Sequence, residues 1–359
     1  MTHRENENQS RSNPLNTSGG FTFPHFPFII SFMSKNFWLK QKKPIFALAP
    51  MADVTDTAFR RIIAKYGKPD VMFTEFVSCD GLMSPGRERL LRDLEYTEGE
   101  RPIVAQIFGA HPDNFRKTAA LVRELGFDGI DINMGCPEKN IQKQGSCAAL
   151  IKVPELAKEI ILATKEGAGD LPVSVKTRIG YHRNEIETWL PALLSAEPAA
   201  ITLHARTKKE MSDVPARWDV VARAVLIRNE LESETLILGN GDVKNLAEAE
   251  TKVKETGVDG VMIGRGIFGN PWLFSERESE PTFEEKFRVI LEHTFLFEEL
   301  FSGIKNFAIM KKHYKAYVEG FPGAKELRVK LMETNSAKEV EYIVRDFLKN
   351  KVDEQGIIW

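Results

Sequence analysis

The chain has 359 residues, of which 42% are hydrophobic and 28% are charged, and its formal net charge is −2. This composition is typical of a soluble globular protein, and the length allows one large domain with a smaller one beside it. Because the net charge is close to zero, no overall field attracts polyanions. A nucleic-acid surface would therefore have to be a local basic patch.

The chain contains three cysteines, Cys79, Cys136 and Cys147, and no C-x-x-C pair. An odd count without such a pair argues against a disulfide framework and against a zinc knuckle. We therefore expect no metal site. We also expect a cytoplasmic protein, because a reducing compartment keeps thiols free.

Residues 1–36 differ from the rest of the chain. The first half of this segment is polar and rich in Asn and Ser, which predicts disorder. The aromatic stretch "FTFPHFPFIISFMSKNF" has too short an apolar run to span a bilayer, and it lacks the pattern of a signal peptide. We interpret the segment as a disordered or non-native extension with the natural initiator at Met33. The alternative is a loose anchor or partner segment.

From Pro44 onward, short apolar or β-branched runs alternate with amphipathic helical stretches. Continuous apolar strands between helices predict a parallel sheet that is covered on its faces. Eight such units match the size of a (β/α)8 TIM barrel, which we assign to residues 37–280. A doubly wound open sheet is the main competitor, but no G-x-G-x-x-G turn follows the first strand. The predicted strands are residues 45–49, 71–76, 102–108, 129–133, 172–176, 199–204, 235–240 and 260–264.

Two of the helical stretches, residues 112–126 and 153–167, each end at a glycine, which is a common C-terminal signal of helices. After Pro281 the apolar pattern is helical in period and shows no strand. We therefore expect a small all-α helical domain over residues 281–359.

The loops after the seventh and eighth predicted strands are rich in glycine. They contain Asn240, Gly241 and Asp242 in one loop and Gly264 and Arg265 in the other. TIM barrels often bind a phosphate group with these two loops, whose backbone amides can approach an anion. The alternative is a pair of tight turns. Because the two loops occur together, the sequence favours a phosphate site.

Three polar residues of the predicted strands point to the rest of the ligand. Lys176 is expected at the end of an apolar strand, where it would stabilise the negative charge of a reduced flavin or else reach solvent. Gln106 would pair with the amide edge of an isoalloxazine ring or with neighbouring backbone. His204 is either a structural residue or one that lines the flavin or the substrate. With the phosphate loops, these residues predict FMN.

Cys136 lies in "DINMGCPEKN", between a glycine and a proline directly after a predicted strand. Such a turn would hold a reactive thiol at the mouth of a pocket. With several other motifs, this one resembles the tRNA-dihydrouridine synthases of the FMN-dependent, bacterial type. The other motifs are "LAPMADVTDTAFR", "GSCAALIK", "VKTRIG", "HARTKKEM", "GNGDV" and "MIGRGIFGNPW". The resemblance runs from about Ala49 to Leu348 and includes "KKHYKAYVEG" and "LRVKLMET" in the helical tail.

The resemblance implies an FMN enzyme that uses NADPH to reduce the C5–C6 double bond of particular uridines in tRNA. Cys136 would give a proton to C5 while hydride from the flavin reaches C6, and Asn133 and Arg206 would contact the substrate. Because a general acid must keep its proton until it acts, we expect Cys136 not to be strongly acidified. The residues implied to bind FMN are Pro50, Met51, Ala52, Gln106, Lys176, His204, Asn240, Gly241, Asp242, Gly264 and Arg265.

Three further residues have no assigned role in the chemistry. Cys79 and Cys147 are interpreted as packing or loop thiols. Glu75 is interpreted either as a structural residue or as one that orients the flavin edge.

A uridine inside folded RNA cannot reach a flavin in a barrel, so the nucleotide would have to be flipped out. The tail would recognise tRNA through its shape and phosphates, using the basic run between Lys305 and Lys330. The alternative is a solvated charged face. The residues implied to bind RNA are Lys311, Lys312, Lys315 and Arg328.

Two rival functions remain open at this point. The first is an FMN barrel that reduces a free pyrimidine or another small enone, with the tail serving oligomerisation. The second is a tRNA-binding protein without chemistry. Under the favoured interpretation the partners are tRNA and NADPH, no membrane is involved, and the protein is a monomer.

Overall fold

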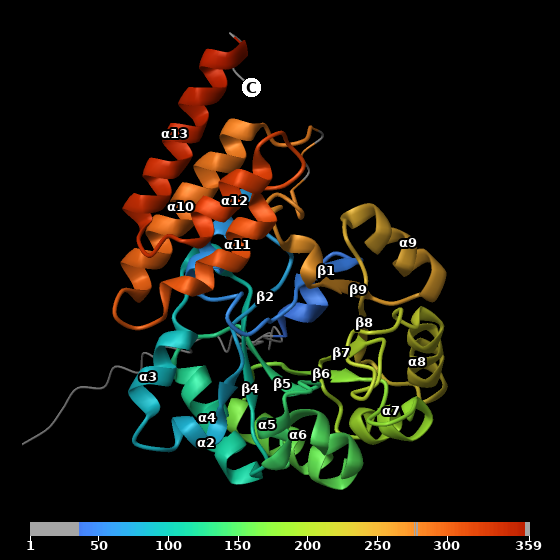
Figure 1. The fold of residues 1–359 in the computed structure, drawn as a ribbon. Helices are drawn as coiled ribbons and strands as arrows, with labels where there is room; N and C mark the ends of the chain where they lie inside the picture. Colours follow the sequence, from blue (N-terminus) through green and yellow to red (C-terminus); the bar gives the residue numbers. More distant parts are fainter. Residues whose placement is uncertain (1–35, 276, 278, 356–359) are drawn as a thin grey trace, which may run out of the picture. The chain divides into compact units, whose positions relative to one another are not determined.

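The computed structural model describes residues 36–275, 277 and 279–355. The predicted extension therefore lies outside the described residues, except for Asn36. The described chain contains a sheet of nine parallel strands surrounded by helices (Figure 1). The strands are β1 (Ile45–Leu48), β2 (Met72–Phe73), β3 (Val77–Ser78), β4 (Ile103–Phe108), β5 (Gly129–Met134), β6 (Val173–Arg178), β7 (Ala200–His204), β8 (Leu236–Asn240) and β9 (Gly260–Ile263).

The sheet closes on itself. Its order is β1-β9-β8-β7-β6-β5-β4-β2, and a parallel bridge between Ala47 and Val71 joins its two edges. The amide of Leu48 donates to the carbonyl of Val71 at 3.2 Å. β2 lies in the predicted strand 71–76, β3 follows it, and both pair with β4. The predicted (β/α)8 barrel is confirmed, with a break in its second strand.

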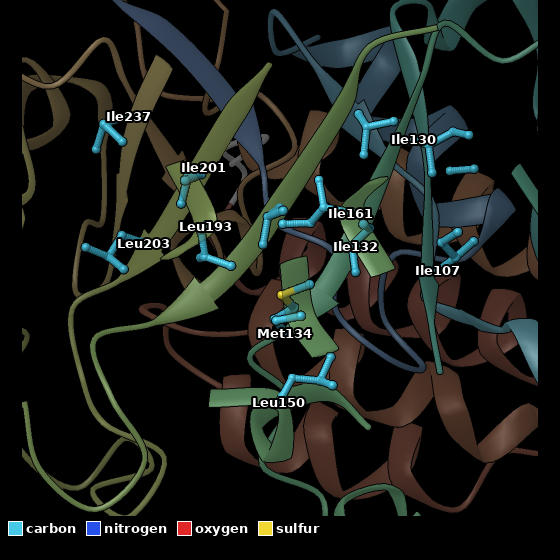
Figure 2. Close-up of a cluster of buried hydrophobic side chains, with 14 of the residues drawn as sticks. Ile107, Ile130, Ile132, Met134, Leu150, Ile161, Leu193, Ile201, Leu203 and Ile237 are labelled. Atoms are coloured by element: carbon cyan, nitrogen blue, oxygen red, sulfur yellow. The ribbon is translucent and has the colours of Figure 1, made fainter. Parts of the chain in front are cut away.

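Helices cover the outside of the barrel. Successive side chains of a strand point to opposite faces, so every second residue packs outward against them. Ile130, Ile132 and Met134 of β5 lie in one apolar cluster with Ile161 and Leu193 of two covering helices (Figure 2). The helices of the barrel are α1 (Thr57–Tyr66), α2 (Cys79–Leu82), α3 (Arg87–Leu91), α4 (Pro112–Glu124), α5 (Lys139–Lys143), α6 (Pro154–Ala168), α7 (Ile186–Leu194), α8 (Trp218–Glu230) and α9 (Leu246–Thr256).

The predicted end of α6 at Gly167 is wrong. The helix continues to Ala168 and ends at Gly169, whose φ of 61° is in the left-handed region that favours glycine. Gly167 is instead a packing residue, because a Cβ there would lie 2.0 Å from the carbonyl oxygen of Arg116 on α4. A glycine near a helix end thus serves the contact between α4 and α6.

The inside of the barrel is apolar at its floor and polar at its mouth. Ile45, Val104 and Leu238 belong to the apolar floor, together with Phe37 and Trp38 of the short 3-10 helix η1 (Phe37–Lys40). Further along the strands, the inward positions carry polar side chains. These are Gln106, Asp131, Asn133, Ser174, Lys176, Thr202, His204 and Asn240.

The chain after residue 281 forms helices in the described part, as the sequence predicts. Their apolar faces form a core that also includes Ala58 and Ile62 of α1 and Trp272. The described residues all belong to one compact unit, so the domain boundary at 281 stays a prediction. Within the described ranges, no helix is long and apolar enough to cross a bilayer. The tail helices are α10 (Phe283–Phe301), α11 (Met310–Tyr317), α12 (Ala324–Met332) and α13 (Ala337–Gln355).

A buried ion pair holds the segment before β4 against α1. Nε of Arg60 lies 2.7 Å from Oε2 of Glu100, and both side chains are 0% exposed. We expect Arg60→Met to lower the free energy of unfolding by about 3–5 kcal/mol, because it leaves a buried carboxylate without its partner. Denaturant titration measures this change. The control is Arg223→Met, whose partner Glu187 is exposed, and a similar loss in that variant would contradict the explanation.

Candidate active site at the mouth of the barrel

A cavity of about 640 Å³ opens at the carboxyl ends of the strands, which is where TIM barrels place their chemistry. Most of the residues predicted to form the site line this cavity. Ala52 and Gln106 do not line it. The predicted residues in its wall are Pro50, Met51, Asn133, Cys136, Lys176, His204, Arg206, Asn240, Gly241, Asp242, Gly264 and Arg265.

The strand register explains why residues so far apart in the sequence meet. Asn133 is paired with Lys176 across β5 and β6, and His204 is paired with Asn240 across β7 and β8. Each of these residues occupies an inward position close to the end of its strand. Their side chains therefore converge on the mouth of the barrel.

The loops after β8 and β9 form the glycine-rich side of the cavity. Gly241 has a φ of 134°, and a Cβ there would lie 2.8 Å from the Cβ of Ala216. Gly266 lets the second loop approach the first, because its Cβ would lie 2.8 Å from the carbonyl oxygen of Lys244. The β9 loop continues as the short 3-10 helix η5 (Arg265–Ile267). Both glycines are therefore needed for the backbone to enclose this end of the cavity.

Two arginines and one carboxylate border the same end. Arg206 is buried, and its guanidinium bonds to Asp242, while Arg265 donates to the other carboxylate oxygen at 3.1 Å. The Arg206 guanidinium holds the pKa of Asp242 below its usual range. Asp242 therefore serves to orient two arginines here. The substrate contact that the resemblance implies for Arg206 stays a prediction.

The prediction that Lys176 is the last residue of its strand is wrong, because β6 continues to Arg178. Its Nζ donates to Oδ1 of Asn240 at 3.3 Å. Burial lowers the pKa of Lys176 to about 8, an effect that Arg178 increases and Asp131 opposes. At neutral pH the amine is therefore still mostly protonated, and it lines the cavity as a cation.

Asp131 is a buried carboxylate that was not predicted from the sequence. It occupies the inward position below Lys176, and it accepts hydrogen bonds from Ser174 at 2.6 Å and from Gln106 at 2.7 Å. Burial raises its pKa to about 6, and those hydrogen bonds oppose the rise. The sequence does indicate it, because Asp131 is the polar residue of "GIDIN" two positions before Asn133, on the same face of the strand.

His204 is held as a neutral ring. Burial is the main cause that lowers its pKa, to about 2, and the surrounding cations Lys176, Arg178, Arg206 and Arg265 lower it further. Its Nε2 lies 3.2 Å from the guanidinium of Arg206. Because a guanidinium only donates, Nε2 must accept, and Nδ1 carries the ring proton.

Gln106 and Asn133 form a support under the predicted catalytic turn. Nδ2 of Asn133 donates to Oε1 of Gln106 at 3.1 Å. Oδ1 of Asn133 accepts from the amides of Gly135 and Cys136, both at 3.0 Å. The amide groups of both side chains are thus used inside the protein. Their implied contacts with flavin and uracil stay predictions.

Arg178 was also not predicted as a site residue, although it lies in the motif "VKTRIG". Its Nε donates to the carbonyl of Gly135 at 2.8 Å, and its NH1 donates to the carbonyls of Thr207 and Met211. Burial lowers the pKa of Arg178 to about 10. This guanidinium fixes the Gly135-Cys136 turn against the β7 loop. Lys176 and Arg178 are two residues apart along one strand, and this alternation indicates that both face the same side of the sheet.

The prediction that Cys136 is not strongly acidified is wrong. A hydrogen bond from the buried thiol of Cys147 lowers the pKa of Cys136 to about 7, against the opposing effect of burial. Burial and the neighbouring Cys136 raise the pKa of Cys147 well above its usual value. Cys147 is therefore more than a packing thiol, because it donates to the sulfur of the residue expected to act as the acid.

The four residues predicted to bind RNA differ in their surroundings. Lys315 is exposed, and Lys311 is half-buried on the same helix, α11. Lys312 donates to the carbonyl of Asp53 at 2.7 Å, and Arg328 donates to the carbonyl of Val318 at 2.8 Å. Two of the four thus have partners within the protein.

We expect Cys147→Ala to raise the pKa of Cys136 toward its ordinary value, because the thiolate loses a hydrogen-bond donor. The pH dependence of Cys136 alkylation by iodoacetamide, followed by peptide mass spectrometry, measures this pKa. Cys147→Ser keeps a donor and is expected to stay close to the wild type. An unchanged alkylation profile in Cys147→Ala would contradict the role of Cys147.

Comparison with known proteins agrees with this geometry. A family model described as dihydrouridine synthase (Dus) matches residues 47–352. A probable tRNA-dihydrouridine synthase of Staphylococcus aureus (strain COL) is 41% identical over 318 residues, covering 88% of this chain and 96% of that protein. A probable tRNA-dihydrouridine synthase 2 of Bacillus subtilis (strain 168) is 41% identical over 324 residues, covering 89% and 99%.

Among solved structures, a histamine dehydrogenase from Rhizobium sp. 4-9 is similar with a TM-score of 0.50 and 14% identity, covering 70% of this chain and 48% of that chain. At this identity the likeness concerns the fold alone. The family model, in contrast, covers both the barrel and most of the tail. The chain therefore belongs to the dihydrouridine synthase family.

Proposed function

We propose that this chain reduces the C5–C6 double bond of specific uridines in tRNA, with FMN as its bound cofactor and NADPH as the reductant. One observation carries the proposal. In a member of this family, a single cavity is bordered both by the Cys136 turn and by the glycine loops after β8 and β9. The free cysteines in the described chain support a cytoplasmic location.

The residues present fit a flavin mononucleotide. Gly241, Gly264 and Gly266 expose backbone at one end of the cavity, where Arg206 and Arg265 supply positive charge for a phosphate group. Pro50 and Met51 would border the ring. When bound and reduced, the flavin supplies a hydride for C6 of the uracil.

Lys176 and His204 would act on the ring from the wall of the cavity. The Lys176 ammonium would stabilise negative charge on a reduced ring, because it is held near neutral pH as a cation beside Asn240. His204 stays neutral, so it would act as an N–H donor without adding a further positive charge. The two residues thus divide charge stabilisation and hydrogen bonding.

Cys136 would deliver the proton to C5 of the uracil. The turn that carries it is fixed by Asn133 from one side and by Arg178 from the other, which positions the sulfur for transfer. Because its pKa is about 7, the protonated fraction falls as the pH rises through neutrality. The rate of proton transfer would therefore fall above about pH 7 and be restored toward lower pH.

The tRNA would be held by Lys311 and Lys315 of α11. A buried flavin site requires the target nucleotide to leave the RNA stack, and the energy for this comes from contacts elsewhere on the molecule. Lys315 is exposed and Lys311 is half-buried, so both ammonium groups are suited to phosphate contacts.

We expect Cys136→Ala to purify with FMN bound but to lose turnover by about 100-fold or more, as for removal of a general acid. Flavin absorbance measures the bound FMN. The turnover is measured as the dihydrouridine content of tRNA from cells in which the variant replaces their own gene. A colourless wild-type protein would refute the proposal that the chain is an FMN enzyme. A yellow protein that reduces free uracil compounds but leaves tRNA unmodified would favour the rival small-enone reductase.

The double variant Lys311→Glu and Lys315→Glu is expected to weaken tRNA binding and to reduce its salt dependence, by about one unit of log–log slope for each phosphate that the protein no longer neutralises. Filter binding at several salt concentrations measures both effects. Lys338→Glu on α13 is a control at an exposed site outside the predicted patch. Equal affinity of the double variant and the wild type would show that α11 does not contact the RNA.

A further inference from the structure

The loop after β1 is held in an unusual conformation by side chains from other elements. Asp53 has a φ of 54°, in the left-handed region that non-glycine residues rarely adopt. Its amide donates to Oε1 of Glu75 at 2.5 Å, and its carbonyl accepts from Nζ of Lys312 at 2.7 Å. Arg60 donates to the carbonyl of Thr55 at 2.8 Å, so the end of the loop is held as well.

Glu75 connects this loop to the helical tail. While one carboxylate oxygen accepts from Asp53, the other lies 2.8 Å from Nζ of Lys305. Lys305 follows α10 and also contacts Asp93 at 3.0 Å. The side chains of Lys305 and Glu75 are only 18% and 10% exposed, so water screens the pair little. Although burial opposes it, the two carboxylates raise the pKa of Lys305 to about 12, so the cation persists at any physiological pH.

The same loop forms part of the cavity wall. Pro50 and Met51 line the cavity, and Met51 is tied to the following turn. Its carbonyl accepts from the amides of Val54 and Thr55, and its amide donates to Oγ1 of Thr55 at 3.0 Å. Because these bonds make residues 51–55 one compact turn, a displacement of Asp53 would displace Met51.

We propose that Lys305 and Lys312 of the tail are positioning residues that hold the β1 loop as a wall of the flavin cavity. The tail thus completes the cofactor site in addition to binding tRNA. The inference rests on the proposed function for the identity of the ligand, whereas the positioning itself concerns only this chain. It also gives Glu75 a role as the bridge between tail and loop.

This role differs from the RNA contact implied for Lys312 by the family resemblance. A lysine that contacts only phosphate would leave the β1 loop unchanged when it is removed. Removal of a positioning lysine would instead loosen the β1 loop, even in the protein without RNA. The two roles therefore separate in measurements made on the protein alone.

The test compares Lys305→Met and Lys312→Met with Lys315→Met, which removes an exposed lysine of the same helix as Lys312. Hydrogen exchange of the cofactor-free protein reports on residues 51–56, and fluorescence titration gives the Kd for FMN. We expect faster exchange at residues 51–56 and FMN binding about tenfold weaker in the first two variants, because small displacements of a supporting shell cost binding energy. Lys315→Met is expected to match the wild type in both measurements.

Lys305→Arg keeps the cation and is expected to restore both exchange and FMN affinity, which a simple packing role would not predict. Wild-type exchange and FMN affinity in both Met variants would overturn the proposal. So would a lower melting temperature without a local change at residues 51–56. If the wild type binds no FMN, the proposed function fails, whereas the exchange measurement still decides whether the lysines position the loop.

Discussion

The strict alternation of side chains along a barrel strand is the constraint on which the rest of this structure depends. Every second residue of a parallel strand faces the interior, and closure of the sheet brings those residues together. The inner positions start apolar, with Ile45 and Leu238, and end polar, with Lys176 and Asn240. One pattern therefore produces both the packed floor and the chemical mouth.

The strands and most of the cavity wall could be predicted because their signals are local. Apolar runs mark the strands, and the polar residue at the end of each run marks the mouth. Arg178 was overlooked because β6 runs two residues further than its apolar part indicates. The partners of Lys305 and Lys312 could not be found in this way, because Glu75 and Asp53 lie more than two hundred residues earlier in the chain.

The role of Cys147 was hidden for a similar reason. Its thiol reaches Cys136 only because the intervening loop folds back, with Cys147 itself at a φ of 56° and the amide of Ala148 donating to the carbonyl of Cys136. Nothing in the spacing of the two cysteines requires that geometry. Charge placement shows the same dependence on folding, since Asp242 meets Arg206 and Arg265 only once β7, β8 and β9 are aligned.

The short helix before β1 has a consequence for how much of the chain is needed. Phe37 is 8% exposed and Trp38 is 1% exposed, and the indole lies 6.4 Å from the ring of Phe73 between their centroids. The side chains of Phe37 and Trp38 close the end of the barrel opposite the cavity. A shortened chain that began after them would open the hydrophobic interior to water from below, and it would lose stability even though every residue of the active site remained.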